Sequence, residues 1–320
     1  FDISGENSIV KCEFIKVYDT ENYRSTPKQL IEQGQALTPT VNSDTGEIEY
    51  VEEAGGKGFD FDEPEPPTPT TPDYLCFTAE QANSTVGITN HNNNNPNVEY
   101  SLDGGQTWTT LANNTPITLS NVGDKMYVRG NNPNGFSTTD SVDYTNFTMS
   151  GQIAASGNVM SLIDTTNFDS ITTIPNNGCF VSLFMGCSSL TTAPSLPATT
   201  ITEGCYNSMF DSCSGLTTAP TLPATTLFYN CYGFMFYGCT SLTTAPTLPA
   251  TTLVERCYAN MFDGCTSLNY VKAMFKTIGT NSTLYWLRGV AREGTFIKNP
   301  DASVSILNAP EGWTVIDGRG

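Results

Sequence analysis

Eight of the ten cysteines recur at intervals of 26 residues, in two series. The series are Cys179, Cys205, Cys231 and Cys257, and Cys187, Cys213, Cys239 and Cys265. Such thiols could form disulfides, bind zinc or pack as small apolar groups. The two cysteines of a pair are separated by seven residues, which disfavours zinc because zinc knuckles are shorter. The strict period favours two ladders of buried thiols, and disulfides between some adjacent units remain the alternative.

Pairs of threonines recur with the same period and could form a binding face. They are Thr191 and Thr192, Thr217 and Thr218, and Thr243 and Thr244. A ladder of hydroxyls offers donors and acceptors at fixed spacing with little charge to desolvate, which suits a neutral glycan or a polar protein surface. The structural alternative is that threonine simply suits a half-exposed strand. Glycan sites usually add a stacking ring, and Tyr229, Tyr237 and Trp108 are isolated candidates.

Residues 101–108, Ser-Leu-Asp-Gly-Gly-Gln-Thr-Trp, match the Asp-box pattern of sialidase propellers. Asp103 can accept hydrogen bonds from turn amides, the glycines permit positive φ, and Trp108 can pack over the hairpin. Sialidases repeat the box and need a cluster of arginines, whereas this chain has one box with only Arg129 nearby. We therefore interpret Asp103 and Trp108 as structural residues of a stabilised hairpin.

Catalytic, metal and cofactor chemistry finds little support in the remaining residues. His91 is the single histidine, and the chain contains no G-x-S-x-G elbow, P-loop or H-E-x-x-H motif. Acid pairs such as Asp60 and Asp62 lie in an acidic, proline-rich stretch, where a solvated surface is the simpler interpretation. We expect no enzymatic activity, no metal and no cofactor.

The charge balance narrows the class of partner. The formal net charge is -18, from 14 Lys and Arg against 32 Asp and Glu, so we expect no nucleic-acid partner. No apolar run approaches the roughly 18–20 residues of a membrane span. Residues 151–265 carry only seven charged side chains, a surface that suits neutral polar ligands or another protein. The chain opens at Phe1 without a signal-like segment, so we expect it to be processed or trimmed.

The 26-residue period also predicts the elements that position these residues. Regular leucines with a period in the twenties indicate a leucine-rich-repeat solenoid. Cys205-Tyr206 and Met209-Phe210 have the apolar spacing of one or two helical turns, which Gly186, Gly238 and Gly264 end in their units. The Leu-Thr-Thr-Ala-Pro segment that follows predicts a short strand, and stacking would extend it into a parallel sheet. The expected fold class is therefore multi-domain and β-rich, with an α/β leucine-rich-repeat solenoid.

Composition divides the chain into four parts. Residues 1–59 are expected to form a short α+β attachment or docking segment. Residues 60–72 contain five prolines and predict an extended linker, with a Pro-rich peptide ligand as the alternative. Residues 73–150 predict a small, immunoglobulin-like β-sandwich, and residues 151–320 the repeats with their caps.

Local patterns predict the elements within the first and third parts. A strand is expected over residues 9–18, a helix over 26–34, and a hairpin turn at Asp44-Thr45-Gly46. The sandwich strands are expected at residues 74–78, 98–102, 107–111, 117–119 and 125–129, separated by clusters of Asn, Asp, Gly and Pro.

The repeat unit resembles a known family. The pattern C-Y-x-x-M-F-x-G-C-T-S-L, here residues 257–268, is similar to the BspA-like leucine-rich repeats found in surface proteins of Bacteroides-type bacteria and in their phages and prophages. Residues 153–162, 294–300 and 310–315 resemble the lead-in and closing cap of that family. The resemblance covers roughly residues 74–317 and implies extracellular recognition or adhesion, with no catalytic residues. It does not extend to residues 1–60.

Three functions are consistent with these observations. The first is a non-enzymatic recognition or adhesion protein on a bacterial cell surface, whose partner is a surface glycan or protein receptor. The second is a phage virion appendage that binds a bacterial surface, with residues 1–59 docked on a larger assembly. A glycan-processing enzyme is a remote third possibility, because the Asp box lacks its partners.

Overall fold

The computed structural model describes residues 37–41, 48–52, 72–137 and 143–318. The chain divides into two compact units, residues 1–69 and 70–320. The predicted strand over 9–18, the helix over 26–34, nearly all of the linker and Cys12 lie outside the described residues.

The first unit contains one described pair of strands. Strands β1 (Leu37–Val41) and β2 (Ile48–Glu52) pair in antiparallel fashion, with Val41 opposite Ile48. This pairing agrees with a hairpin between Val41 and Ile48, whereas its predicted turn, Asp44-Thr45-Gly46, lies outside the described residues.

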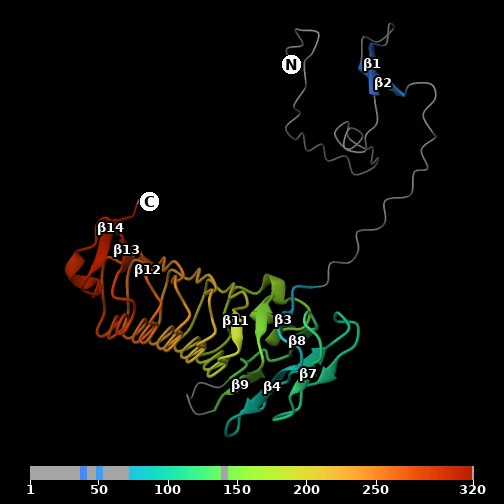
Figure 1. Ribbon diagram of the computed structural model, residues 1–320, viewed down its shortest axis with the longest axis horizontal. Helices are drawn as coiled ribbons and strands as arrows, with labels where there is room; N and C mark the ends of the chain where they lie inside the picture. Colours follow the sequence, from blue (N-terminus) through green and yellow to red (C-terminus); the bar gives the residue numbers. More distant parts are fainter. Residues whose placement is uncertain (1–36, 42–47, 53–71, 138–142, 319–320) are drawn as a thin grey trace. The chain divides into compact units, whose positions relative to one another are not determined.

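The second unit begins with two β-sheets (Figure 1). The larger has the strand order β11-β10-β3-β8-β5-β6, and the smaller has the order β7-β4-β9. The strands are β3 (Leu75–Ala79), β4 (Ser84–Asn90), β5 (Glu99–Ser101), β6 (Thr109–Thr110), β7 (Ile117–Leu119), β8 (Lys125–Arg129), β9 (Thr145–Ser150), β10 (Ile153–Ser156) and β11 (Leu190–Thr192). Strands β3 and β5 to β8 fall where the sequence predicts strands, whereas β4 and β9 are additional.

One core connects these sheets with the repeats that follow. The Phe77 ring of β3 lies 4.9 Å from the Phe147 ring of β9, so the two sheets pack against each other. The Phe147 ring in turn stacks at 5.4 Å on Phe184 of the first repeat unit. Strand β10 pairs with β3 on one side and with β11 of the first repeat on the other. The larger sheet therefore contains strands from both sides of residue 150, so the parts predicted as residues 73–150 and 151–320 share one continuous sheet.

Chain segments 26 residues apart stack on one another between β11 and β12 (Tyr270–Ala273), as Figure 1 shows. Within each unit we name one stretch the turn segment: residues 178–187, 204–213, 230–239, 256–265 and 281–289. In the second unit, backbone N–H groups of alternate residues donate to the next unit, as Tyr206 does to Cys231 O (3.0 Å). The intervening N–H groups donate three residues back, as Met209 does to Tyr206 O (3.2 Å).

The turn segments are not helices. A residue with positive φ recurs at every fourth position, and in the second unit these residues are Gly204, Ser208 and Ser212. A left-handed residue interrupts an α-helix each time it occurs, because right-handed φ and ψ are needed throughout. The described residues contain three short 3-10 helices and no α-helix: η1 (Val159–Leu162), η2 (Phe168–Ser170) and η3 (Val304–Ile306).

Among the described residues, the parallel sheet expected along the repeats forms only at their two ends, where β10 pairs with β11 and where a sheet begins with β12. Between β11 and β12 the extended segments meet only in isolated bridges, such as those of Thr192 with Thr218 and of Thr244 with Tyr270. Two prolines in each of the first three extended segments, such as Pro220 and Pro223, remove backbone donors that a ladder needs, whereas the segment that contains β12 has none. The predicted fold class, an α/β leucine-rich-repeat solenoid, is therefore wrong. The chain is β-rich, with small sheets and stacked turns.

Columns of aromatic rings fill the interior of the stack. Phe184, Phe210, Phe236 and Phe262 form one column, with ring centroids 5.3, 5.5 and 5.5 Å apart. Tyr206, Tyr232 and Tyr258 form a second, at 5.8 and 6.0 Å. Trp286 lies against the last ring of both columns, and it is followed by the parallel sheet of β12, β13 (Gly294–Lys298) and β14 (Trp313–Asp317).

The left-handed positions offer a test of the turn geometry. Ser212 has φ 61°, where the next unit has Gly238 at φ 68°. We expect Ser212→Gly to raise the free energy of unfolding by about 0.5–1 kcal/mol, because glycine adopts positive φ without the steric cost of a Cβ. The reverse change, Gly238→Ser, should lower it by a similar amount. Urea unfolding of both variants measures the pair, and equal signs for the two changes would contradict the assignment.

Candidate functional site

The cysteine ladders lie inside the stack. All eight repeat cysteines are buried, free thiols. In the second series each Sγ donates to a phenylalanine carbonyl of the preceding structural layer, as Cys239 does to Phe210 O (3.1 Å) and Cys265 to Phe236 O (2.9 Å). Burial raises the pKa of Cys187, Cys205, Cys257 and Cys265 to about 12. Such thiols are protonated and shielded, so their role is packing rather than nucleophilic or redox chemistry.

The described part of the chain holds no group of three or more His, Cys, Asp or Glu side chains placed to bind a metal ion. Within the same residues, no helix has the length and apolar character needed to cross a bilayer.

The hydrogen bonds of the Asp-box carboxylate all come from residues of the same turn. Asp103 Oδ1 accepts from the backbone N–H of Gln106 (3.0 Å) and of Thr107 (2.9 Å), and Oδ2 accepts from Thr107 Oγ1 (2.6 Å). These bonds, of which that from the Thr107 hydroxyl has the largest effect, hold the pKa of Asp103 well below its usual range. Ser101 Oγ adds a bond at 2.7 Å. The carboxylate is thus engaged within its own turn.

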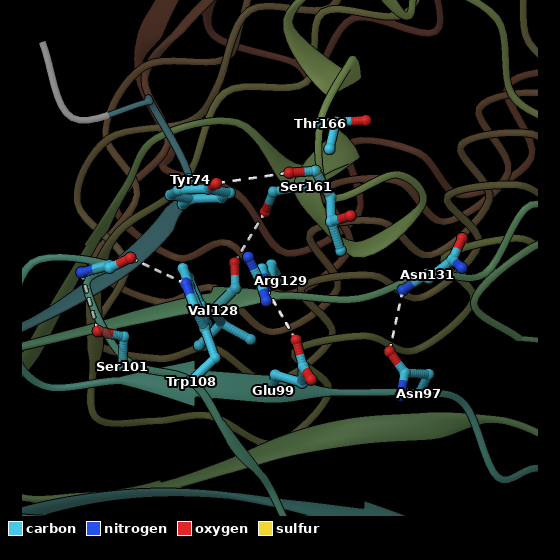
Figure 2. A network of polar contacts seen from close by, with 12 residues as sticks. Tyr74, Asn97, Glu99, Ser101, Trp108, Val128, Arg129, Asn131, Ser161 and Thr166 are labelled. Atoms are coloured by element: carbon cyan, nitrogen blue, oxygen red, sulfur yellow. Dashed lines mark hydrogen bonds and ion pairs between the residues drawn. The ribbon is translucent and has the colours of Figure 1, made fainter. Parts of the chain in front are cut away.

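Trp108 joins the Asp box to a polar network shown in Figure 2. Its Nε1 donates to Gly105 O (2.9 Å), and the Arg129 guanidinium lies 4.1 Å from the ring centroid. Arg129 Nε also donates to Glu99 Oε2 (2.8 Å), and the Tyr74 ring packs edge-on against Trp108 at 4.9 Å. The arginine and the carboxylate satisfy each other, so the network braces β5 and β8.

The threonines predicted as a binding face divide into two groups. The hydroxyls of Thr191, Thr192 and Thr217 donate to backbone carbonyls of the preceding layer, such as Thr191 O at 3.1 Å from Thr217. A second acceptor of the Thr191 hydroxyl is Glu80 Oε2 (2.7 Å). The remaining three, Thr218, Thr243 and Thr244, are exposed, and their hydroxyls have no hydrogen-bond partner among the described residues.

Exposed threonines extend further along each unit than the sequence interpretation recognised. The segment from Pro220 to Thr225 alternates buried and exposed residues, which turns Thr221 and Thr225 outward. Thr247 and Thr251 are exposed at the same places of the next unit. The repeated Leu-Pro-Ala-Thr-Thr motif in the sequence could have indicated these additional exposed threonines. We define the threonine face as the exposed residues Thr217, Thr218, Thr221, Thr225, Thr226, Thr243, Thr244, Thr247, Thr251 and Thr252.

Two hollows mark other parts of the surface. One, of about 350 Å³, lies between Asn95 to Val98 and Thr110 to Asn113. The other, of about 390 Å³, is lined by residues 283–288 together with Asn308 and Pro310. The sequence interpretation singled out neither.

Comparison with known proteins adds no relative to these observations: no family model, no curated protein and no solved structure matches this chain.

Proposed function

We propose that this chain is a non-enzymatic, extracellular recognition protein, and that its threonine face binds a glycan or protein receptor on a bacterial surface. The observation that carries the proposal is that the hydroxyls of Thr218, Thr243 and Thr244 are exposed and bond to no group in the described part of the chain.

The chemistry of this face supports a neutral polar partner. A hydroxyl can donate and accept, and it is less costly to desolvate than a charged group. Prolines at 220, 223, 246 and 249 restrict the backbone that carries the threonines, so little conformational entropy is lost when a ligand binds. The backbone bridges of Thr192 with Thr218 and of Thr244 with Tyr270 further hold neighbouring segments in place.

Lysines on the threonine face should weaken recognition. We expect Thr218→Lys/Thr244→Lys to reduce binding to Bacteroides-type cells and to an immobilised glycan array by at least about tenfold, because two ammonium groups would need desolvation in any complex. Both positions are exposed, so the fold should tolerate the change. The measurement is retention of the labelled full chain on fixed cells and on the array.

A matched variant separates this effect from added charge alone. Thr166→Lys/Thr314→Lys introduces the same two charges at exposed positions away from the threonine face, and it should bind as the unaltered chain does. If the unaltered chain binds and Thr218→Lys/Thr244→Lys binds equally well, the threonine face is scaffold and the proposal fails.

A further inference from the structure

We infer that the turn segments carry a second binding site, for a neutral saccharide, built around Phe234, Tyr237 and Tyr285. The third repeat unit departs from its neighbours at two of these places. Phe234 stands where the adjacent units have Ser208 and Asn260, and Tyr237 stands where they have Asp211 and Asp263. The two rings lie 5.9 Å apart between centroids.

The stability of the fold does not account for these rings. Phe234 is 36% exposed, and Tyr285 is 55% exposed. Phe234 and Tyr285 also have positive φ, 55° and 53°, which costs a bulky residue more than it would cost glycine or asparagine. Every unit has a left-handed residue at this position, so the turn imposes the φ, and Ser208 or Asn260 meets it at less cost than an exposed ring does. The rings therefore add surface that a ligand could contact rather than packing in the core.

Backbone hydrogen bonds place these residues in one row. Phe234 N–H donates to Ala259 O (2.9 Å), and Asn260 N–H donates to Leu284 O (2.8 Å). Phe234, Asn260 and Tyr285 therefore occupy equivalent positions in three successive units. Phe234 and Tyr285 are thus two layers apart, within the reach of a short oligosaccharide, and Asn260 occupies the equivalent position of the layer between them.

Polar groups accompany the row. Asp263 is buried and forms an ion pair with Arg288 through both of its oxygens. The Arg288 guanidinium lies 4.6 Å from the Tyr285 ring centroid, while its side chain stays 58% exposed. Both residues line the hollow of about 390 Å³ that Asn308 and Pro310 complete. The site thus combines a stacking ring, spare guanidinium and amide groups, and a concave surface.

This combination selects a neutral saccharide. The apolar faces of a pyranose stack on aromatic rings, and its hydroxyls pair with guanidinium and amide groups. Asp263 already neutralises Arg288, so the site holds no unpaired positive charge for an anionic sugar. The residues are separate from the threonine face, so the inference goes beyond the proposed function and can fail independently of it.

The test measures binding of four neutral oligosaccharides to the full chain: hexamers of glucose, mannose, galactose and N-acetylglucosamine. Saturation-transfer NMR detects contact and calorimetric titration gives the affinity. We expect at least one hexamer to bind with a Kd of about 1 mM or tighter. Tyr285→Ala and Phe234→Ser should each weaken it by roughly tenfold, the loss of one stacking ring.

Two further variants keep the result specific. Tyr285→Phe retains the ring and should retain binding within about twofold, which separates stacking from a role of the hydroxyl. Leu102→Ala removes a comparably exposed apolar side chain elsewhere and should have no effect.

The inference is overturned if none of the four hexamers binds, or if Tyr285→Ala and Phe234→Ser bind as well as the unaltered chain. It is also overturned if sedimentation shows that the rings are covered by a second copy of the chain, with a dimer that Phe234→Ser dissociates. These criteria for the saccharide site do not depend on how the threonine-face variants behave.

Discussion

The chain is expected to unfold when the pH is raised from 7 to about 9.5, because its eight repeat thiols must stay protonated inside the stack. Burial raises the pKa of Cys187, Cys205, Cys257 and Cys265 to about 12 and moves the pKa of the other four in the same direction. In the unfolded chain each thiol returns to an ordinary pKa of about 8.5.

The direction of the effect follows from linkage. The pKa is higher in the folded state, so the contribution of each thiol to stability is full below about pH 8.5 and is lost as the pH rises towards the folded value. Above that point each thiol removes about 1.4 kcal/mol per pH unit. By pH 9 the eight together remove about 7 kcal/mol, which is comparable with the roughly 5–15 kcal/mol that stabilises a typical domain.

The measurement is the free energy of unfolding in urea at pH 7, 8, 8.5 and 9, followed by circular dichroism under reducing conditions. Cys213→Ala/Cys239→Ala removes two of the eight thiols, so its slope against pH should be shallower by about a quarter. Stability at pH 9 that equals stability at pH 7 would contradict the burial of free thiols, as would a mass that shows disulfides in the native chain.

Truncation of a ring in the central column is expected to cause the largest loss of stability from a single substitution. The Phe236 side chain is fully buried, and it lies between the rings of Phe210 and Phe262 at 5.5 Å on each side. Phe236→Ala should lower the free energy of unfolding by about 3–5 kcal/mol, because the change removes buried apolar surface and leaves a cavity between two layers that are hydrogen-bonded in place.

Phe228→Ala is the matched control, since Phe228 lies just before the turn segment that contains Phe236 but is 39% exposed. Its loss should stay below about 1 kcal/mol. Urea unfolding at pH 7 gives both values. A loss below about 1.5 kcal/mol for Phe236→Ala would mean that the column is not the packed core of the repeats.

Some features of the fold could be inferred from residue types and their spacing alone, without the three-dimensional structure. The 26-residue period alone places Cys213, Cys239 and Leu242 at recurring sites, because stacking puts equivalent residues in equivalent surroundings. The hairpin of β1 and β2 was likewise predictable, since Asp44-Thr45-Gly46 is a local turn signal that does not depend on the rest of the fold.

Strand β4 shows the limit of what local sequence patterns can predict. Its residues Thr85, Val86, Ile88 and Thr89 are β-branched and favour a strand, but Gly87 interrupts the run and an asparagine-rich loop follows it. It forms because β9, about sixty residues later, pairs with it from Thr85 to Asn90. A Cβ at Gly87 would come within 3.0 Å of Pro116, so the glycine that hides the strand in the sequence is required by its packing.

By itself the sequence determined the period of the repeats, the residues that share each position and the neutral character of the repeat surface. Only the tertiary structure decided that Cys205, Tyr206, Met209 and Phe210 lie on stacked turns rather than on a helix, because their apolar spacing is the same in both. The choice depends on backbone N–H groups that donate to the neighbouring unit and on left-handed residues such as Ser208 and Phe234, which no residue type announces. Stacking likewise placed Tyr285 in the row of Phe234 and Arg288 beside Asp263, because proximity across layers is set by the hydrogen bonds between units and not by distance along the chain.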